Sequence, residues 1–249
     1  MNLFSPIDSY YNIFLHTPHF HFPSFPCYLS EAATPQRHST RESTCLMMAA
    51  ERRVVVTGMG ITSCLGNTLE DVTASLKQAK SGITFAEDYK ELGIKSQVCG
   101  RPNLSDDDFK ELIPKAQLRF MGNNAKFAYI AMKNAIEDAG LQPEDYEENP
   151  RVAGILGQGG TSIPDITETV DAVNSGAKRW KNKVGPFRVT RSMGSTVSAV
   201  LSTAFKLQGP SFSISSACST GAHCIGTGFE QILLGKSDMA FCGAGKNEI

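Results

Sequence analysis

The amino-acid sequence predicts an α/β fold in which helices cover both faces of a mostly parallel sheet. Short runs of β-branched and small apolar residues alternate along the chain with longer segments whose apolar residues recur at helical spacing. Several short runs end in glycine, as buried strands followed by tight turns do. Two of the longer segments are poor in charge and rich in small residues, which fits helices packed inside a layered structure.

Composition narrows the classes of function. The 249 residues are enough to bury a substantial core in one large domain or two small ones. A net charge of −1 gives no electrostatic reason to expect nucleic acid or a membrane surface as a partner. No apolar run approaches the roughly 20 residues that a helix needs to cross a bilayer. The seven cysteines form no CxxC pair and no Cys/His cluster with zinc-ligand spacing, so we expect thiols in a reducing compartment and no metal site.

The first 50 residues differ from the others, and we expect them to lie outside a folded domain at residues 51–249. They hold four of the five histidines and five of the 12 prolines. Hydroxylated residues and arginines over Ser30–Arg41 fit an organelle-targeting segment, and a disordered or mis-assigned extension is the alternative. We expect Pro6–Pro35 to have no regular structure. The expected location is the cytoplasm, or a plastid or mitochondrion if residues 1–47 are a targeting segment.

The folded part begins at Arg53. Residues 54–57 form a β-branched run that ends in Gly-Met-Gly, which predicts a buried strand and a tight turn. Residues 67–79 have a capping-type polar start and helically spaced apolar residues, so they predict a helix. Residues 82–120 are mixed and contain several turn residues. They predict an irregular excursion with one short helix near 106–112.

The middle of the chain shows the clearest helix. Residues 124–139 place their apolar side chains on one face, and Gly140 supplies the stop. Residues 152–157 predict a buried strand, followed by a Gly-rich loop over 157–161. This loop lacks the Lys-Ser/Thr pair of a phosphate loop, so we interpret it as a close-packing turn. A helix is expected over 165–174.

The last third of the chain alternates helix and strand. Residues 194–207 are dense in Ser, Ala and Val and predict a helix. Residues 211–216 predict a strand, 218–234 a helix and 239–243 a final strand. The helices 194–205 and 218–234 are the two segments of low charge that we expect in the layered interior.

Cys218 is the candidate nucleophile, because it stands at the turn from a predicted strand to a predicted helix. Unpaired N–H groups at a helix start favour a thiolate and stabilise an oxyanion on a thioester carbonyl under attack. The neighbouring Ala217, Ser219 and Gly221 are small and leave room for an incoming acyl chain. A buried structural cysteine is the alternative interpretation.

Two nearby residues are excluded as partners of Cys218 by helical geometry. His223 lies five positions on, about 140° round a helix, and Cys224 lies six positions on, displaced by about 120°. Both are therefore expected to be packing residues of the helix. No well-placed general base for Cys218 is found up to Ile249.

Four motifs together resemble one enzyme family. These are Val54-Val-Val-Thr-Gly-Met-Gly-Ile, Ser81-Gly-Ile, Asn149-Pro-Arg-Val and the run from Ser213 to Gly226, Ser-Ile-Ser-Ser-Ala-Cys-Ser-Thr-Gly-Ala-His-Cys-Ile-Gly. They are similar to the amino-terminal half of the type I β-ketoacyl-acyl-carrier-protein synthases, the bacterial-type elongating condensing enzymes of fatty acid synthesis. The resemblance implies the amino-terminal half of a thiolase-like α/β fold with layered αβαβα architecture.

The resemblance also implies a reaction. An acyl group passes from acyl-carrier protein to Cys218, and decarboxylation of malonyl-acyl-carrier protein then lengthens it by two carbons to a 3-oxoacyl-acyl-carrier protein. In the family, two histidines that promote the decarboxylation and a nearby lysine come from the carboxy-terminal half, and no cofactor is needed. The family forms homodimers in which the strand matching Phe212–Ser216 pairs with its mate. The alternative is a catalytically incomplete half-domain, or a fragmentary gene model, that needs a partner chain.

Overall fold

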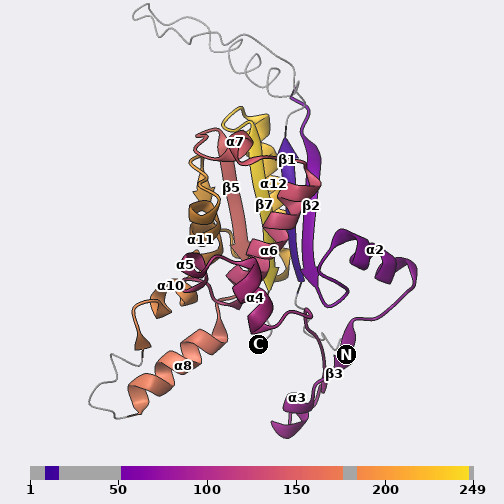
Figure 1. Cartoon of the computed structure of the whole chain (residues 1–249), viewed down its shortest axis with the longest axis vertical. Coiled ribbons are helices and arrows are strands. Elements are labelled where there is room, and N and C mark those ends of the chain that lie inside the picture. Colours follow the sequence, from indigo (N-terminus) through magenta and orange to yellow (C-terminus); the bar gives the residue numbers. More distant parts are fainter. Residues whose placement is uncertain (1–8, 17–51, 176–183, 247–249) are drawn as a thin grey trace, which may run out of the picture.

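A computed structural model of the chain describes residues 9–16, 52–175 and 184–246. Figure 1 shows the long strands side by side, with helices packed on them. The elements in chain order are β1 (Ser9–His16), β2 (Val55–Ser63), α2 (Leu69–Lys77), β3 (Ile83–Phe85), α3 (Glu87–Glu91), β4 (Val98–Gly100), α4 (Asp106–Leu112), α5 (Lys115–Leu118), α6 (Asn123–Asp138), α7 (Pro143–Tyr146), β5 (Val152–Gln158), α8 (Ile163–Asn174), α10 (Arg188–Ser192), α11 (Thr196–Ala204), β6 (Ser211–Phe212), the 3-10 turn η1 (Ala217–Ser219), α12 (Thr220–Leu233) and β7 (Met239–Lys246).

The main sheet has five strands in the order β2-β1-β7-β5-β6. β5 pairs in parallel with β6 and β7, whereas β1 pairs antiparallel with both of its neighbours. β2 therefore runs in the same direction as β7, and four of the five strands run one way. The predicted mostly parallel sheet is confirmed. The one strand of opposite direction comes from the amino-terminal extension.

Helices cover both faces of this sheet, as the sequence predicted. On one face, Val152 and Leu156 of β5 join Phe241 of β7 in an apolar cluster built largely from α6 and α11. On the other face, Ile155 and Cys242 pack against α12. Successive strand residues thus point into different clusters. All seven residues of β5 are buried, as expected for a strand covered on both sides.

The helix α6 packs directly on β2 because two glycines of that strand leave room for the helix backbone. A Cβ atom on Gly60 would lie 1.9 Å from the carbonyl oxygen of Ala131, and one on Gly58 would lie 2.4 Å from that of Ala135. The predicted tight turn at residues 58–60 is therefore wrong, since these residues continue β2. Their glycines permit close approach of α6 instead of a turn.

The predicted irregular excursion over residues 82–120 carries more regular structure than expected. It contains the small antiparallel sheet β3-β4 and the short helices α3, α4 and α5. The predicted helix near 106–112 is confirmed as α4. Ser105 begins it with a capping box, in which the Asp108 carboxylate accepts from the Ser105 N–H at 2.7 Å. Figure 1 shows α2 beside the end of β2 and α3 farther out, next to β3, with both helices away from the main sheet.

The strand β1 contradicts the expectation that Pro6–Pro35 has no regular structure. All eight residues of Ser9–His16 are in register with partners on both β2 and β7. The segment is rich in aromatic and branched apolar residues, which favour extended structure. Pairing on both sides also satisfies its backbone groups, which the composition of the whole extension could not indicate. The predicted targeting segment falls on residues 17–47 as well, which lie outside the described residues.

The expectation that residues 218–234 form a helix in the layered interior, and not at a surface, holds for only one face of α12. Its buried residues recur every four positions on one face, which packs on β1, β5 and β7; they are Thr220, Cys224, Gly228 and Ile232. On the opposite face Phe229 is 43% exposed. Low charge and small residues therefore mark a helix that presents an apolar outer face, and they do not by themselves indicate burial.

Candidate active site

Cys218 lies in the turn that joins β6 to α12, as the sequence predicted. The strand is shorter than expected, since β6 ends at Phe212 and residues 213–216 lead into η1 without further sheet pairing. The helix α12 begins at Thr220, two residues after the cysteine. Cys218 is exposed, which contradicts the alternative interpretation as a buried structural cysteine. Its sulfur is therefore accessible to an incoming thioester.

The backbone immediately before Cys218 adopts a strained conformation. Ala217 has a φ of +50°, a left-handed value that costs a residue with a Cβ atom roughly 1–2 kcal/mol. The buried hydroxyl of Thr220 holds this conformation from both sides. It accepts a hydrogen bond from the Ser216 N–H at 2.9 Å and donates one to the Ala217 carbonyl oxygen at 2.8 Å. Thr220 thus fixes the turn that presents Cys218.

The loop after β5 supports the same turn. A Cβ atom on Gly157 would lie 2.3 Å from the Ile214 carbonyl oxygen, and one on Gly159 would lie 3.0 Å from that of Ala217. The interpretation of this Gly-rich loop as a close-packing turn is therefore confirmed. Because glycine has no Cβ atom, the backbone at position 157 can pack directly against the segment that leads to Cys218.

A buried amide network holds that loop in place. The Gln158 side chain donates to the Met193 carbonyl oxygen at 2.8 Å and accepts from the Asn124 side-chain amide at 3.1 Å. The same Asn124 amide donates to the Gly160 carbonyl oxygen at 2.9 Å. Both side chains are almost fully buried. The network ties α6 and Met193, the residue that caps the end of α10, to the loop beside Cys218. The sequence did not indicate this network, because single buried amides carry no sequence signal.

Removing the Gln158 amide is expected to destabilise the fold. Gln158→Met keeps the size of the side chain but leaves the Met193 carbonyl and the Asn124 amide each short of a buried partner. The expected loss in free energy of unfolding is about 2–4 kcal/mol. Chemical denaturation measures it, with Gln208→Met at an exposed position as the matched control, where a change below about 0.5 kcal/mol is expected. Equal stabilities of the two variants would show that the network contributes nothing.

His223 and Cys224 differ in their exposure and contacts. The His223 Nδ1 atom is hydrogen-bonded to the Ser216 hydroxyl at 2.7 Å, and the residue is exposed. The expectation that His223 is a packing residue is therefore wrong, because the ring turns back to the turn that precedes α12. Cys224 is fully buried, as expected of a packing residue. Within the described residues no hydrogen bond joins His223 to Cys218, in line with the predicted separation.

Two buried thiols near this site are poorly disposed to react. Burial raises the pKa of Cys224 to about 11, although backbone hydrogen bonds at Ile214 and Gly243 oppose the shift. Burial also raises the pKa of Cys242. The thiolate is the reactive form of cysteine, so these residues stay inert near neutral pH. Exposed Cys218 is the candidate nucleophile of the three.

The raised pKa values predict a loss of stability at alkaline pH. In the unfolded chain these thiols ionise near pH 9, whereas the folded chain keeps Cys224 protonated up to about pH 11. The unfolded state therefore binds fewer protons above pH 9, and the free energy of unfolding falls as the pH rises from about 9 towards about 11. Denaturation curves across that range measure the slope. Cys224→Ala is expected to make it shallower, and an unchanged slope would contradict the assignment to Cys224.

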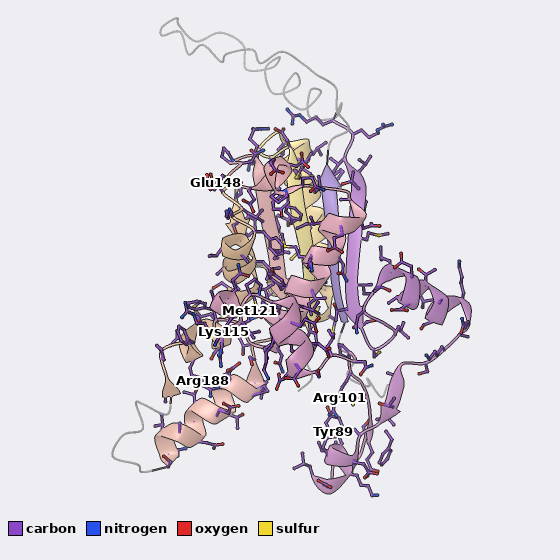
Figure 2. The ribbon with its side chains drawn as sticks, in the orientation of Figure 1. Tyr89, Arg101, Lys115, Met121, Glu148 and Arg188 are labelled. Atoms are coloured by element: carbon purple, nitrogen blue, oxygen red, sulfur yellow. The ribbon has the colours of Figure 1, made fainter. Side chains whose placement is uncertain are left out.

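A polar cavity of about 530 Å³ is lined by residues that fall within 106–126, 162–168 and 188–191. Ser162, four residues after Gln158, lines it, as do Lys115, Met121 and Arg188. Figure 2 shows these last three residues gathered at the end of the sheet where α5, α6 and α10 meet. Six basic and three acidic side chains line the cavity. It therefore offers positive charge and contains no cysteine.

The acidic residue deepest in this cavity is already paired. Arg188 donates to the Asp165 carboxylate at 2.9 Å, and Arg191 lies 3.7 Å from the same oxygen. The Ser162 hydroxyl donates to Asp165 at 2.7 Å. Lys115 and Arg119 stay exposed at the cavity, so its accessible charge is positive.

The described residues form neither a metal-binding cluster nor a membrane-spanning helix. Across residues 9–16, 52–175 and 184–246, no group of three or more His, Cys, Asp or Glu side chains is placed to hold a metal ion. None of the helices in those ranges is both long enough and apolar enough to cross a bilayer.

Comparison with known proteins gives the family. Residues 51–249 match the family described as "Beta-ketoacyl synthase, N-terminal domain". The chain is 46% identical over 195 residues to 3-oxoacyl-acyl-carrier-protein synthase 1 of Escherichia coli K12, covering 78% of this chain and 47% of that protein. It is 32% identical over 194 residues to 3-oxoacyl-acyl-carrier-protein synthase 2 of Vibrio harveyi, covering 78% and 45%. The chain thus spans about half the length of the curated relatives it matches.

Solved structures agree with this match. The ishigamide ketosynthase/chain length factor superposes with a TM-score of 0.65 at 25% identity, covering 76% of this chain and 46% of that one. A β-ketoacyl synthase from Burkholderia phymatum gives a TM-score of 0.60 at 24% identity, covering 74% and 44%. The predicted amino-terminal half of a thiolase-like α/β fold is confirmed. The chain belongs to the β-ketoacyl synthase family and carries that family's amino-terminal domain.

Proposed function

We propose that this chain captures acyl groups from acyl-carrier protein on Cys218, the first half of the 3-oxoacyl-acyl-carrier-protein synthase reaction. The observation that carries the proposal is an exposed cysteine at a strand-to-helix turn whose strained backbone is held by Thr220. The relatives named for this activity match the stretch of chain that contains the turn. Fatty acid synthesis is therefore the process in which we place it.

The capture step is a thioester exchange. The Cys218 sulfur attacks the carbonyl carbon of the acyl-carrier thioester, and a new carbon–sulfur bond forms as the bond to the carrier sulfur breaks. The proton lost from Cys218 ends on the released carrier thiol. We propose that backbone N–H groups at this turn stabilise the oxyanion that forms on the carbonyl oxygen. The tetrahedral intermediate then collapses to the acyl-enzyme.

The condensation that follows needs a second set of groups. Malonyl-acyl-carrier protein loses carbon dioxide, and the carbanion equivalent attacks the acyl group on Cys218 to give the 3-oxoacyl product and the free thiol. The two histidines that the resemblance assigns to the decarboxylation, and the lysine near them, belong to the half of the relatives that this chain does not span. We therefore propose capture, and not condensation, as the activity of these residues alone.

A transfer assay tests the proposal. The chain incubated with acyl-loaded carrier protein is expected to release about one equivalent of carrier thiol per chain and then stop, because each Cys218 accepts one acyl group. Added malonyl-carrier protein is expected to give no elongated product. Elongated product would show that the histidines and lysine are dispensable, and the absence of any thiol release would contradict capture itself.

The positive cavity supports acyl-carrier protein as the partner. A carrier protein delivers its acyl group on a phosphate-bearing arm, and exposed Lys115 and Arg119 offer that phosphate complementary charge. Lys115→Glu and Arg119→Glu are expected to slow acyl transfer from the carrier without slowing transfer from a small acyl thioester that has no phosphate. Equal slowing with both donors would show that the substitutions disturb the Cys218 site and not carrier binding.

We also propose a homodimer formed through β6. This strand is the edge of the main sheet and pairs with β5 on one side, while Phe212 is 40% exposed. An edge strand of this kind offers its free backbone groups to a second copy. Light scattering is expected to give a dimer that Phe212→Asp weakens. Phe85→Asp, at a residue 52% exposed outside the main sheet, serves as the control. A monomeric unaltered chain would contradict the dimer.

A second candidate function is a half-domain that acts only with another condensing-enzyme chain. The outer face of α12, with Phe229 exposed, favours it because an apolar helix face of this kind is suited to burial against a partner. The transfer assay separates the two candidates, since a half-domain without its partner releases no carrier thiol.

For the active chain we propose a reducing compartment, because Cys218 must remain a free thiol. The cytoplasm is the compartment that we propose.

A further inference from the structure

The strand β1 comes from outside the family domain and yet lies inside that domain's sheet. The family match begins at residue 51, so Ser9–His16 has no counterpart in it. Its two neighbours, β2 and β7, both fall within the match. The domain sheet therefore has a slot one strand wide between β2 and β7, and in this chain the extension fills it (Figure 1).

Leaving this slot empty would destabilise the fold. Adjacent strands lie 4.7–4.9 Å apart, so without β1 the strands β2 and β7 would face each other across about 9–10 Å, too far to pair. Among the described strands of the main sheet, β2 is hydrogen-bonded to β1 alone. Both facing edges would then present unpaired N–H and C=O groups, between helices α6 and α12 that contact β1. The slot requires an extended segment.

The register of β1 is well defined on both sides. On one side, each residue from Ser9 to His16 is opposite one residue of β7, from Lys246 to Met239, without a shift in register. On the other side the pairing steps past one residue of β2, Thr57, which makes a bulge between Phe14 and Leu15. A bulge fixes register, because a slip by one residue would exchange the two faces of the strand.

From these observations we propose that Ser9–His16 is a donor strand, which the extension supplies to complete the family sheet from within the same chain. The slot is thus a strand acceptor, and it binds an eight-residue extended peptide through backbone pairing on both edges. The proposal concerns assembly of the sheet and is independent of acyl capture.

Hydrogen exchange on the full chain tests the donor strand. In the unaltered chain, backbone amides of β1, β2 and β7 are expected to be protected together. Asn12→Pro removes a backbone donor from the middle of the strand and is expected to speed exchange in residues 55–63 and 239–246 at least about tenfold. Asn2→Pro, the same substitution in the same extension but outside the strand, is the matched control and is expected to leave exchange unchanged.

Rescue by a peptide completes the test. A synthetic peptide with the sequence of residues 9–16 is expected to bind Asn12→Pro and restore protection of β2 and β7, whereas a scrambled peptide is not. The proposal is overturned if β1 amides of the unaltered chain exchange at the rate of an unfolded chain. It is equally overturned if Asn12→Pro leaves β2 and β7 protected. If Asn12→Pro proves insoluble, exchange of β1 in the unaltered chain decides alone.

Discussion

Replacing Cys218 with alanine is expected to abolish acyl capture completely. No other group in the described residues combines a thiol with exposure at a helix start, and Cys224 and Cys242 are buried with raised pKa values. Because Cys218 is exposed, Cys218→Ala is expected to change the free energy of unfolding by less than about 0.5 kcal/mol. Release of carrier thiol measures the loss of capture, and thermal denaturation verifies that the fold survives.

The matched control for this variant is Cys64→Ala. Cys64 is also a partly accessible thiol, but it follows β2 and lies outside the turn. Capture by Cys64→Ala is expected to equal that of the unaltered chain. The proposed site would be contradicted if Cys218→Ala still captured one acyl group per chain while Cys64→Ala captured none. Cys64, and not Cys218, would then be the acyl acceptor.

Replacing Thr220 with valine is expected to slow capture while leaving the nucleophile in place. Valine keeps the shape of threonine but loses the hydroxyl that joins the Ser216 N–H to the Ala217 carbonyl oxygen. Ala217 can then leave its left-handed conformation and carry Cys218 with it. A shift of about 1 Å in a reacting group costs on the order of 100-fold in rate, so we expect a loss of about 10- to 100-fold. Stability is expected to fall by about 1–3 kcal/mol.

Two further variants separate positioning from general destabilisation. Thr220→Ser keeps the hydroxyl and is expected to recover most of the rate. Thr227→Val makes the same change on the same helix, away from the turn, and is expected to have little effect on either rate or stability. Transfer rates at saturating acyl-carrier protein report the effect on the bound complex. Equal rates for Thr220→Val and Thr227→Val would show that the Thr220 hydroxyl does not position Cys218.

The local pattern of apolar residues was sufficient to predict those elements whose structure depends on residues close together in the sequence. The helix α6 and the strand β5 were predicted within a residue or two, because α6 has a regular apolar face and β5 is a continuous apolar run. The turn that carries Cys218 was also placed correctly, since a strand-like run is followed at once by a helical one. These features depend on residues close together in the sequence.

Features that depend on distant segments escaped prediction. Gly58 and Gly60 read as a turn, and only the approach of α6 shows why they lie within a strand. The amides of Asn124 and Gln158 are 34 positions apart and meet only in the folded chain. Strand β1 pairs with segments that begin 39 positions or more beyond its end, Val55 against His16 being the nearest. Such contacts are set by tertiary packing, which periodicity does not report.

Locating the transferred acyl group tests the central claim most directly. The unaltered chain is incubated with acyl-loaded carrier protein and digested. Mass spectrometry of the peptides then identifies the residue that has gained the mass of the acyl group. We predict about one acyl group per chain, attached at Cys218, because that thiol is the exposed one at the turn. An acyl group found on Cys64, on Ser216 or on any other residue, with Cys218 unmodified, would contradict the assignment of Cys218 as the nucleophile.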